Sequence, residues 1–179
     1  MRKVVVAEFM SLDSVVENPA WTSRYWNDEI AKFKSDENLA SDALLLGRVT
    51  YQGFAAAWPE SADEGADRMN NLPKYVVSTT LDKVEWNNST LIKDNIVEEL
   101  TKLKRQDGQD ILVYGSATLV QTLMRRDLID EYRLLVYPVV LGKGQRLFDD
   151  ASKVDLKLVE SQVFSSGVVA LIYQPEREE

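Results

Sequence analysis

The sequence contains no cysteine and no histidine among its 179 residues. Disulfides, thiolate nucleophiles and zinc sites of the usual Cys/His kind are therefore impossible, and we expect no metal site. Ser-His-Asp and Cys-His catalysis are excluded for the same reason. The acid–base groups that remain near neutral pH are carboxylates, lysine, tyrosine and water. We therefore expect the reactive group of any catalysed reaction to come from the substrate or a cofactor.

Basic residues are fewer than acidic ones, with 21 Lys and Arg against 29 Asp and Glu, and the formal net charge is −8. A general binder of nucleic acid or of anionic membranes would need a basic face, so neither partner is expected. No apolar run approaches the ~20 residues of a membrane span, and the first residues turn acidic at Glu8 instead of forming a signal peptide. We expect a cytoplasmic protein with a small-molecule substrate and a single domain over residues 1–179.

Short apolar runs alternate with amphipathic segments along most of the chain. The runs predict strands over residues 3–9, 43–46, 74–78, 90–92, 111–114 and 131–137, followed by a hairpin of residues 156–164 and 168–173. The segments between them predict helices over residues 22–39, 48–56, 63–71, 96–107 and 116–126. This order predicts an α/β fold in which a mainly parallel sheet ends in an antiparallel edge hairpin.

Ligands of such sheets bind beyond the carboxyl ends of the strands, so the strand-to-helix junctions are candidate sites. At the first junction Gly47 ends a strand, and Arg48 and Thr50 begin a helix. The free N–H groups and positive dipole of that helix would attract a phosphate, and the Arg48 guanidinium could bind it through two hydrogen bonds. The alternative is a tight turn with a solvated arginine.

Two more junctions have the same character. Tyr114 leads into the small residues Gly115, Ser116 and Ala117, which would let a ligand approach a helix whose start Ser116 and Thr118 can cap. An ordinary capped helix would have the same pattern. The third junction ends in three hydroxyl residues, Ser78, Thr79 and Thr80, which could bind a ribose or a phosphate or belong to a plain turn.

The order of these motifs resembles the dihydrofolate-reductase-like superfamily, and in particular stand-alone relatives of the RibD C-terminal domain, the reductase domain of the bifunctional riboflavin-biosynthesis enzyme. The resemblance covers nearly the whole chain. It rests on Ser11-Leu12-Asp13, Leu46-Gly47-Arg48-Val49-Thr50-Tyr51, Lys74-Tyr75-Val76-Val77-Ser78, Val113-Tyr114-Gly115-Ser116 and the long stretch from Leu128 to Phe148. It implies a three-layer αβα fold, a homodimer, and NADPH-dependent reduction of a pteridine- or pyrimidine-type molecule.

The resemblance also implies roles for individual residues. Gly47, Arg48 and Thr50 would hold the adenosine-phosphate side of NADPH, Ser78 and Thr79 would lie beside the adenine ribose, and Gly115, Ser116, Ala117 and Thr118 would surround the pyrophosphate. Ala7 and Tyr114 would be further cofactor contacts, and Leu12 and Asp13 would belong to a loop over the nicotinamide.

Two carboxylates are candidate proton donors. Glu29 lies in the first predicted helix, where true dihydrofolate reductases place their substrate-binding carboxylate, and it could hydrogen-bond a pteridine or pyrimidine ring. A solvated acid that favours the helix dipole is the alternative for Glu29. Asp13 is the second candidate because of its place in the loop over the nicotinamide.

The chain also departs from the family pattern. Ser14 and Asp127 stand where glycine is usual, Thr79 stands where relatives often carry arginine, and Tyr114 occupies a position that is often small. The Asp-x-Pro-x-Leu-Thr-x-Arg segment of riboflavin-pathway reductases is missing, and no arginine for a folate tail is evident near residues 71–74. A pyrimidine substrate, a folate substrate and a non-catalytic dimeric nucleotide-binding protein therefore remain open.

Overall fold

The structure, a computed structural model, describes residues 1–150 and 153–178. Eight strands form one sheet with the order β4-β3-β2-β5-β1-β6-β8-β7. They are β1 (Val4–Ser11), β2 (Ser41–Gly47), β3 (Lys74–Val77), β4 (Ser89–Ile92), β5 (Asp110–Val113), β6 (Glu131–Tyr137), β7 (Leu156–Val163) and β8 (Val169–Pro175). The pairs among β1 to β6 are parallel, whereas β8 is antiparallel to β6 and β7. The predicted sheet is confirmed.

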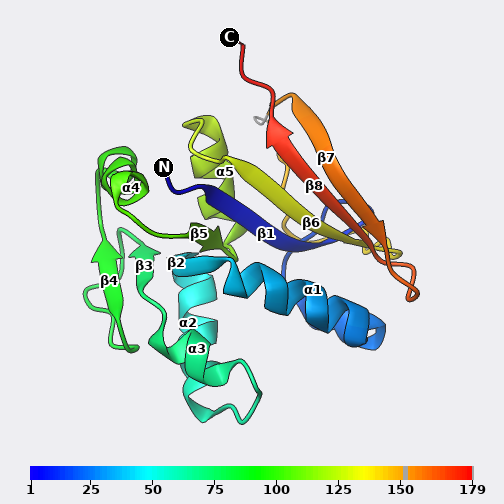
Figure 1. Ribbon diagram of the computed structural model, residues 1–179, viewed down its shortest axis with the longest axis horizontal. Helices are drawn as coiled ribbons and strands as arrows, with labels where there is room; N and C mark the ends of the chain where they lie inside the picture. The colour runs from blue at the N-terminus through cyan, green and yellow to red at the C-terminus, as the bar shows by residue number, and fades with distance from the viewer. Residues whose placement is uncertain (151–152, 179) are drawn as a thin grey trace.

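Helices cover both faces of the sheet, with α4 and α5 on one side and α1, α2 and α3 on the other (Figure 1). The helices are α1 (Asp28–Leu39), α2 (Arg48–Ala57), α3 (Ala66–Asn71), α4 (Ile96–Arg105) and α5 (Ala117–Arg125), with short 3-10 helices η1 (Pro19–Tyr25) and η2 (Trp58–Glu60). Within the described residues, no helix is both long enough and apolar enough to cross a membrane.

The sheet separates two cores because successive strand side chains point to opposite faces. On β1, Val4 and Val6 pack into the core that contains Leu100 of α4 and Leu123 of α5. Val5 points the other way, into the core under α2 and α3. Burying each such aliphatic side chain contributes roughly 1.5–3 kcal/mol, so the apolar run of β1 stabilises both layers.

The helix predicted over residues 22–39 is wrong at its start. The chain forms η1 first and begins α1 only after Asn27, whose extended backbone and side chain cap the helix, with Oδ1 accepting a hydrogen bond from Ile30 N at 3.0 Å. Thr22, one of the expected caps, donates its hydroxyl to the carbonyl of Pro19 at 2.6 Å instead. The first helix therefore contains the segment from Asp28 onward.

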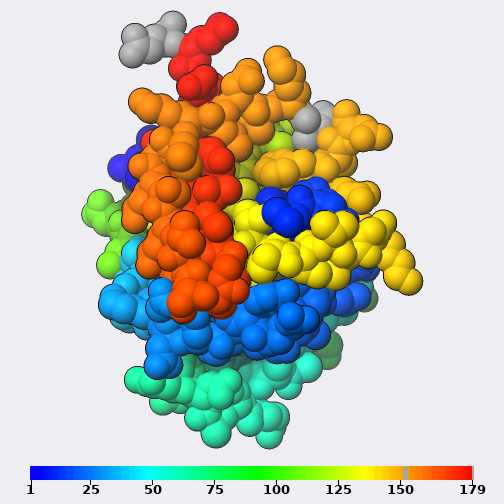
Figure 2. All heavy atoms as spheres, turned by 90° about the vertical axis from the view of Figure 1, so that its right-hand side faces the viewer, coloured from blue at the N-terminus to red at the C-terminus, as the bar shows by residue number. Residues whose placement is uncertain are grey.

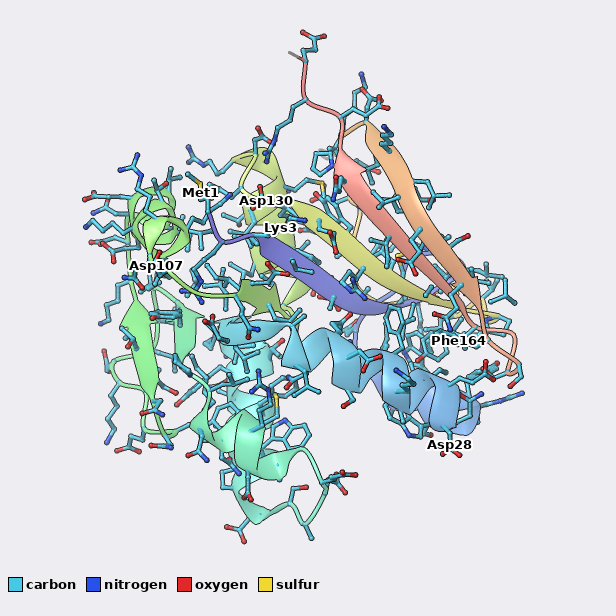
Figure 3. All side chains as sticks on the ribbon, in the orientation of Figure 1. Met1, Lys3, Asp28, Asp107, Asp130 and Phe164 are labelled. Atoms are coloured by element: carbon cyan, nitrogen blue, oxygen red, sulfur yellow. The ribbon has the colours of Figure 1, made fainter. Side chains whose placement is uncertain are left out.

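A third core lies between α1 and the C-terminal hairpin. Ile30 of α1 packs with Tyr137 at the end of β6 and with Phe164 and Val168 beside the hairpin turn. Figure 2 shows the β7–β8 hairpin lying directly over α1, and Figure 3 places Phe164 at the same end of the molecule as Asp28. The start of α1 is thus held by a segment more than a hundred residues later in the chain.

Candidate cofactor and substrate site

The pairing of two central strands ends early. Strand β1 pairs with β5 only as far as Val6, opposite Val113, whereas its pairing with β6 continues to Ser11, opposite Tyr137. Strand β5 ends at Val113, so the pairing stops at the carboxyl ends of the strands, where open α/β sheets bind ligands. We call the place between residues 7–8 and residues 114–115 the wedge. Figure 3 labels Lys3 and Asp130 at the opposite, amino-terminal ends of β1 and β6.

The first two predicted junctions meet beside this wedge. Gly47 N donates a hydrogen bond to Gly115 O at 2.8 Å. A Cβ atom added at Gly47 would lie 2.9 Å from Ser116 N, and one added at Gly115, whose φ is +124°, would lie 2.9 Å from Thr50 Oγ1. The two turns therefore pack backbone against backbone, with no room for side chains at either glycine.

Two helices begin at this contact. The start of α2 has no side-chain cap because its N-cap residue is Gly47, so no N-cap side chain occupies its first N–H groups. Helix α5 is capped by Ser116, whose hydroxyl accepts from Leu119 N at 3.4 Å. The Arg48 side chain is exposed, and its Nη1 donates to Gln52 Oε1 at 3.1 Å. Free N–H groups, two helix dipoles and one guanidinium together suit a phosphate.

A buried carboxyl group lies in the wedge, and the sequence analysis gave it no role. Glu8 of β1 is 8% exposed, and its Oε1 has no hydrogen-bond partner among the described residues. A Cβ added at Gly115 would lie 3.3 Å from that oxygen. Burial raises the pKa of Glu8 well above its ordinary value, although the charge of Lys34 opposes the shift. The sequence feature that could have indicated Glu8 is its position as the only charged residue in the apolar run of residues 4–9.

Lys34 covers the α1 side of the wedge. Its ammonium nitrogen lies 4.9 Å from the ring centre of Tyr114 and 5.1 Å from that of Phe9. It is also ion-paired with Glu37, whose second oxygen accepts from Arg133 Nε at 3.0 Å. Burial lowers the pKa of Lys34, but Glu37 and its other partners together raise it further, so the net shift is upward and Lys34 is a cation near Glu8.

The comparisons with known proteins agree with this geometry. The model of the RibD C-terminal domain matches residues 2–170. The chain belongs to the RibD C-terminal domain family. The uncharacterized protein YyaP of Bacillus subtilis is 38% identical over 138 residues, which cover 74% of this chain and 73% of YyaP. A second uncharacterized protein of that organism, YwjB, is 29% identical over 172 residues, covering 93% of this chain and 95% of YwjB.

Solved structures show the same fold at low identity. A putative riboflavin biosynthesis protein from Shewanella sp. PV-4 has a TM-score of 0.81 and 21% identity, and the match covers 98% of this chain and 99% of that one. Dihydrofolate reductase from Enterococcus faecalis has a TM-score of 0.66 and 13% identity, with 98% and 97% of the two chains covered. The RibD C-terminal domain family and the dihydrofolate-reductase-like fold are thus both shown.

In this RibD C-terminal-type domain, other predicted cofactor contacts have partners of their own or are exposed. Ser78 is buried, and its hydroxyl accepts from the backbone of Thr80 at 3.2 Å, so it closes its own turn. Thr79 is exposed. Leu12 is 64% exposed, and Thr118 accepts a hydrogen bond from Gln145 at 3.0 Å. Their contacts with a cofactor stay predictions.

Asp13 holds a turn of its own RibD C-terminal-type domain. Its oxygens accept hydrogen bonds from the Ser11 hydroxyl at 2.6 Å and from the backbone N–H groups of Leu141 and Gly142 at 3.2 and 2.8 Å. These bonds, that from Ser11 first, lower the pKa of Asp13 to about 2. A group that is ionised above that pH has no proton to give near neutrality, so its contacts do not favour the predicted role in proton delivery.

Glu29 is likewise engaged far along the chain. Its Oε1 accepts from Ser165 N at 3.1 Å and from the Ser165 hydroxyl, and these bonds lower its pKa. The side chain is exposed at the start of α1, beside the hairpin turn, while Lys34 is the α1 residue that faces the wedge. The predicted catalytic role of Glu29 stays a prediction, and its contacts favour attachment of the hairpin.

Proposed function

We propose that this protein is an NADPH-dependent reductase of a pteridine- or pyrimidine-type small molecule, similar to 5-amino-6-(5-phosphoribosylamino)uracil reductase. The observation that carries the proposal is the backbone contact of Gly47 with Gly115, which joins two helix starts beside the wedge. Two similar folds support it. The Enterococcus faecalis structure is a complex with NADP(H). A diaminohydroxyphosphoribosylaminopyrimidine deaminase/5-amino-6-(5-phosphoribosylamino)uracil reductase from Thermotoga maritima has a TM-score of 0.69 and 16% identity, and this chain covers 56% of it.

The residues suit an extended dinucleotide. Gly47 and Gly115 would let phosphate groups approach the backbone, Arg48 would bind the 2′-phosphate, and Thr50 would donate its hydroxyl beside them. Ala7, a buried residue of β1 next to Glu8, would contact the nicotinamide, which supplies a hydride when bound. The chain contributes positioning and electrostatics to this chemistry.

Calorimetric titration with NADPH and NADH is the first test, followed by NADPH oxidation against a panel of pterins, dihydrofolate, pyrimidines and quinones. We expect binding of NADPH and turnover of one heterocycle class. Turnover of dihydrofolate alone would favour the folate alternative. Binding without turnover of any compound would favour the non-catalytic nucleotide-binding alternative, and failure to bind either nucleotide would refute the proposed function.

Arg48→Ala is expected to weaken NADPH more than NADH. A charge-assisted hydrogen bond contributes roughly 1.5–3 kcal/mol, which corresponds to about a tenfold to a hundredfold difference in Kd. Calorimetry with both nucleotides measures it. Arg105→Ala, which removes an exposed arginine in the last turn of α4, is the matched control and should change neither affinity. Equal losses for NADPH and NADH in Arg48→Ala would remove Arg48 from the 2′-phosphate.

We also propose a cytoplasmic homodimer. Its support is the edge strand β7, which is exposed along its length and carries the half-exposed apolar residues Leu158 and Val159 and the more exposed Val163. Apolar residues on an unpaired edge strand are a common sign of association. Light scattering should give twice the chain mass, and Val159→Lys should shift it to the monomer. A parent that is monomeric at high concentration would contradict the dimer.

A further inference from the structure

We propose that Glu8 is a catalytic acid of this site, which as a neutral carboxylic acid donates a hydrogen bond and then its proton to the nitrogen or oxygen of the double bond being reduced. The inference rests on the proposed reductase function. It assigns a catalytic group that neither the sequence motifs nor the family resemblance indicated.

The placement of Glu8 is the first step. Its carboxyl lies in the wedge where β1 leaves β5, and its Oε1 lies near the same point beside Gly115 as the hydroxyl of Thr50. Most buried polar atoms of folded proteins have hydrogen-bond partners, yet this oxygen has none among the described residues. A ligand bound at the carboxyl ends of these strands would supply the missing partner.

The charges around Glu8 are the second step. Lys34 on α1 is the cation whose charge acts on the carboxyl, and the neutral hydroxyl of Thr50 on α2 lies beside Gly115 as Glu8 does. The ring of Tyr114, the residue after β5, lies under the Lys34 ammonium. Lys34 is already ion-paired with Glu37, so its charge only partly offsets the cost of burying an ionised Glu8. Desolvation prevails and the carboxyl keeps its proton at pH values where ordinary glutamates are ionised.

A comparison with the other candidate carboxylates is the third step. Hydrogen bonds lower the pKa of both Asp13 and Glu29, so both are ionised near neutral pH. Glu8 is the candidate whose pKa burial raises, so it keeps its proton to higher pH than the other two. Enzymes raise the pKa of a glutamate by burial when it serves as a general acid.

A reduced nicotinamide, when bound, would supply a hydride to the carbon of a C=N or C=O bond, and the π electron pair would move to the nitrogen or oxygen. That atom takes the proton of Glu8, so the substrate gains two electrons and two hydrogens while the nicotinamide is oxidised. The carboxylate that remains faces the ammonium group of Lys34, which stabilises it until water returns a proton.

The test compares Glu8→Gln with the control Asp110→Asn. Asp110 is a second carboxyl whose pKa burial raises, but it lies at the amino-terminal end of β5, away from the wedge. With NADPH bound, Glu8→Gln should slow the single-turnover hydride step by roughly 10²- to 10⁴-fold and leave NADPH affinity within about twofold. Asp110→Asn should change neither quantity. In Glu8→Gln the rate of the hydride step should also lose the pH dependence that titration of Glu8 gives it in the parent.

Two readouts do not depend on activity. The infrared carbonyl band of a protonated carboxylic acid should be present in the parent near neutral pH and reduced in Glu8→Gln. Folding raises the pKa of Glu8, so the unfolded chain loses this proton at lower pH than the folded protein does. The free energy of unfolding therefore decreases as pH rises from the ordinary glutamate pKa to the raised one. Glu8→Gln removes that loss, so its Tm should exceed that of the parent near neutral pH and match it in acid.

The outcomes separate this inference from the proposed function. An unchanged hydride step in Glu8→Gln, or no protonated Glu8 band in the parent near neutral pH, would overturn the role of Glu8 while NADPH turnover remained. A parent that fails to bind NADPH would overturn both. If Glu8→Gln does not fold, Glu8→Asp, which draws the acid back by one carbon, should show the same slowing. Loss of the hydride step in Glu29→Gln with Glu8→Gln unaffected would return the role to Glu29.

Discussion

Gly115→Val is expected to abolish NADPH binding. At this position the φ angle is +124°, and even a Cβ atom would approach Thr50 Oγ1 to 2.9 Å and Glu8 Oε1 to 3.3 Å. Two branched methyl groups would fill the space in which the backbone is proposed to meet the pyrophosphate. We expect the Kd for NADPH to rise by more than about a hundredfold, which corresponds to roughly 3 kcal/mol.

The same substitution also strains the backbone, so the comparison needs folded protein. A β-branched residue at a positive φ costs of order 1–3 kcal/mol, and the Tm of the variant should fall accordingly. Gly115→Ala is the milder version, and circular dichroism identifies the temperature range in which each variant is folded. Gly53→Ala is the matched control, because a Cβ at that helical position has nothing within 4 Å and should leave NADPH affinity unchanged. A folded Gly115→Val that titrates like the parent would place the pyrophosphate elsewhere.

Local patterns were sufficient for most of the fold. Short apolar runs predicted the central strands, because strands such as β1 are buried on both faces and are therefore apolar in consecutive positions. The two strands of the C-terminal hairpin were predicted from their position around the Ser165-Ser166-Gly167 turn. The start of the first helix was not predictable in this way, since Thr22, Ser23 and Asn27 are all good capping residues. The choice of Asn27 depends on packing of Ile30 against Phe164, which lies at the other end of the chain.

The candidate site was predictable where it is made of short motifs. At Gly47 and Gly115 the local residues alone predict a turn from a strand into a helix, and the structure brings the two turns into contact. The proton donor was harder, because the contacts that decide it join distant segments. Asp13 is engaged by Gly142, Glu29 by Ser165, and the burial of Glu8 depends on where β1 and β5 separate.

At two positions where the chain departs from the family pattern, the backbone keeps the conformation that glycine favours. Ser14 and Asp127, which stand where glycine is usual, have φ angles of +66° and +51°. This left-handed region favours glycine but admits aspartate and, less readily, serine. The sequence alone could not decide whether the turns were altered or the strain was tolerated. Both residues keep the backbone conformation that glycine favours, so these substitutions do not argue against a working site.

Glu37→Ala is expected to be strongly destabilising. Glu37 is 4% exposed and lies between Lys34 and Arg133, which are themselves mostly buried. Removing one partner of a buried ion pair leaves uncompensated charge, which costs about 3–5 kcal/mol. In a chain of 179 residues this corresponds to a fall in Tm of roughly 10 °C, measured by calorimetry.

The neighbouring Asp36→Ala is the control, because Asp36 forms only an exposed pair with Lys32, at 2.6 Å, and should cost less than about 1 kcal/mol. Equal, small losses in the two variants would show that Lys34 and Arg133 are solvated in the absence of Glu37.

Glu37→Gln keeps the shape of the side chain and removes the negative charge that competes with Glu8 for Lys34, so the Lys34 ammonium would act on Glu8 alone. That change should lower the pKa of Glu8 and move the loss of hydride transfer to lower pH. A pH profile of Glu37→Gln that matches the parent would show that Lys34 does not tune the acid in the wedge.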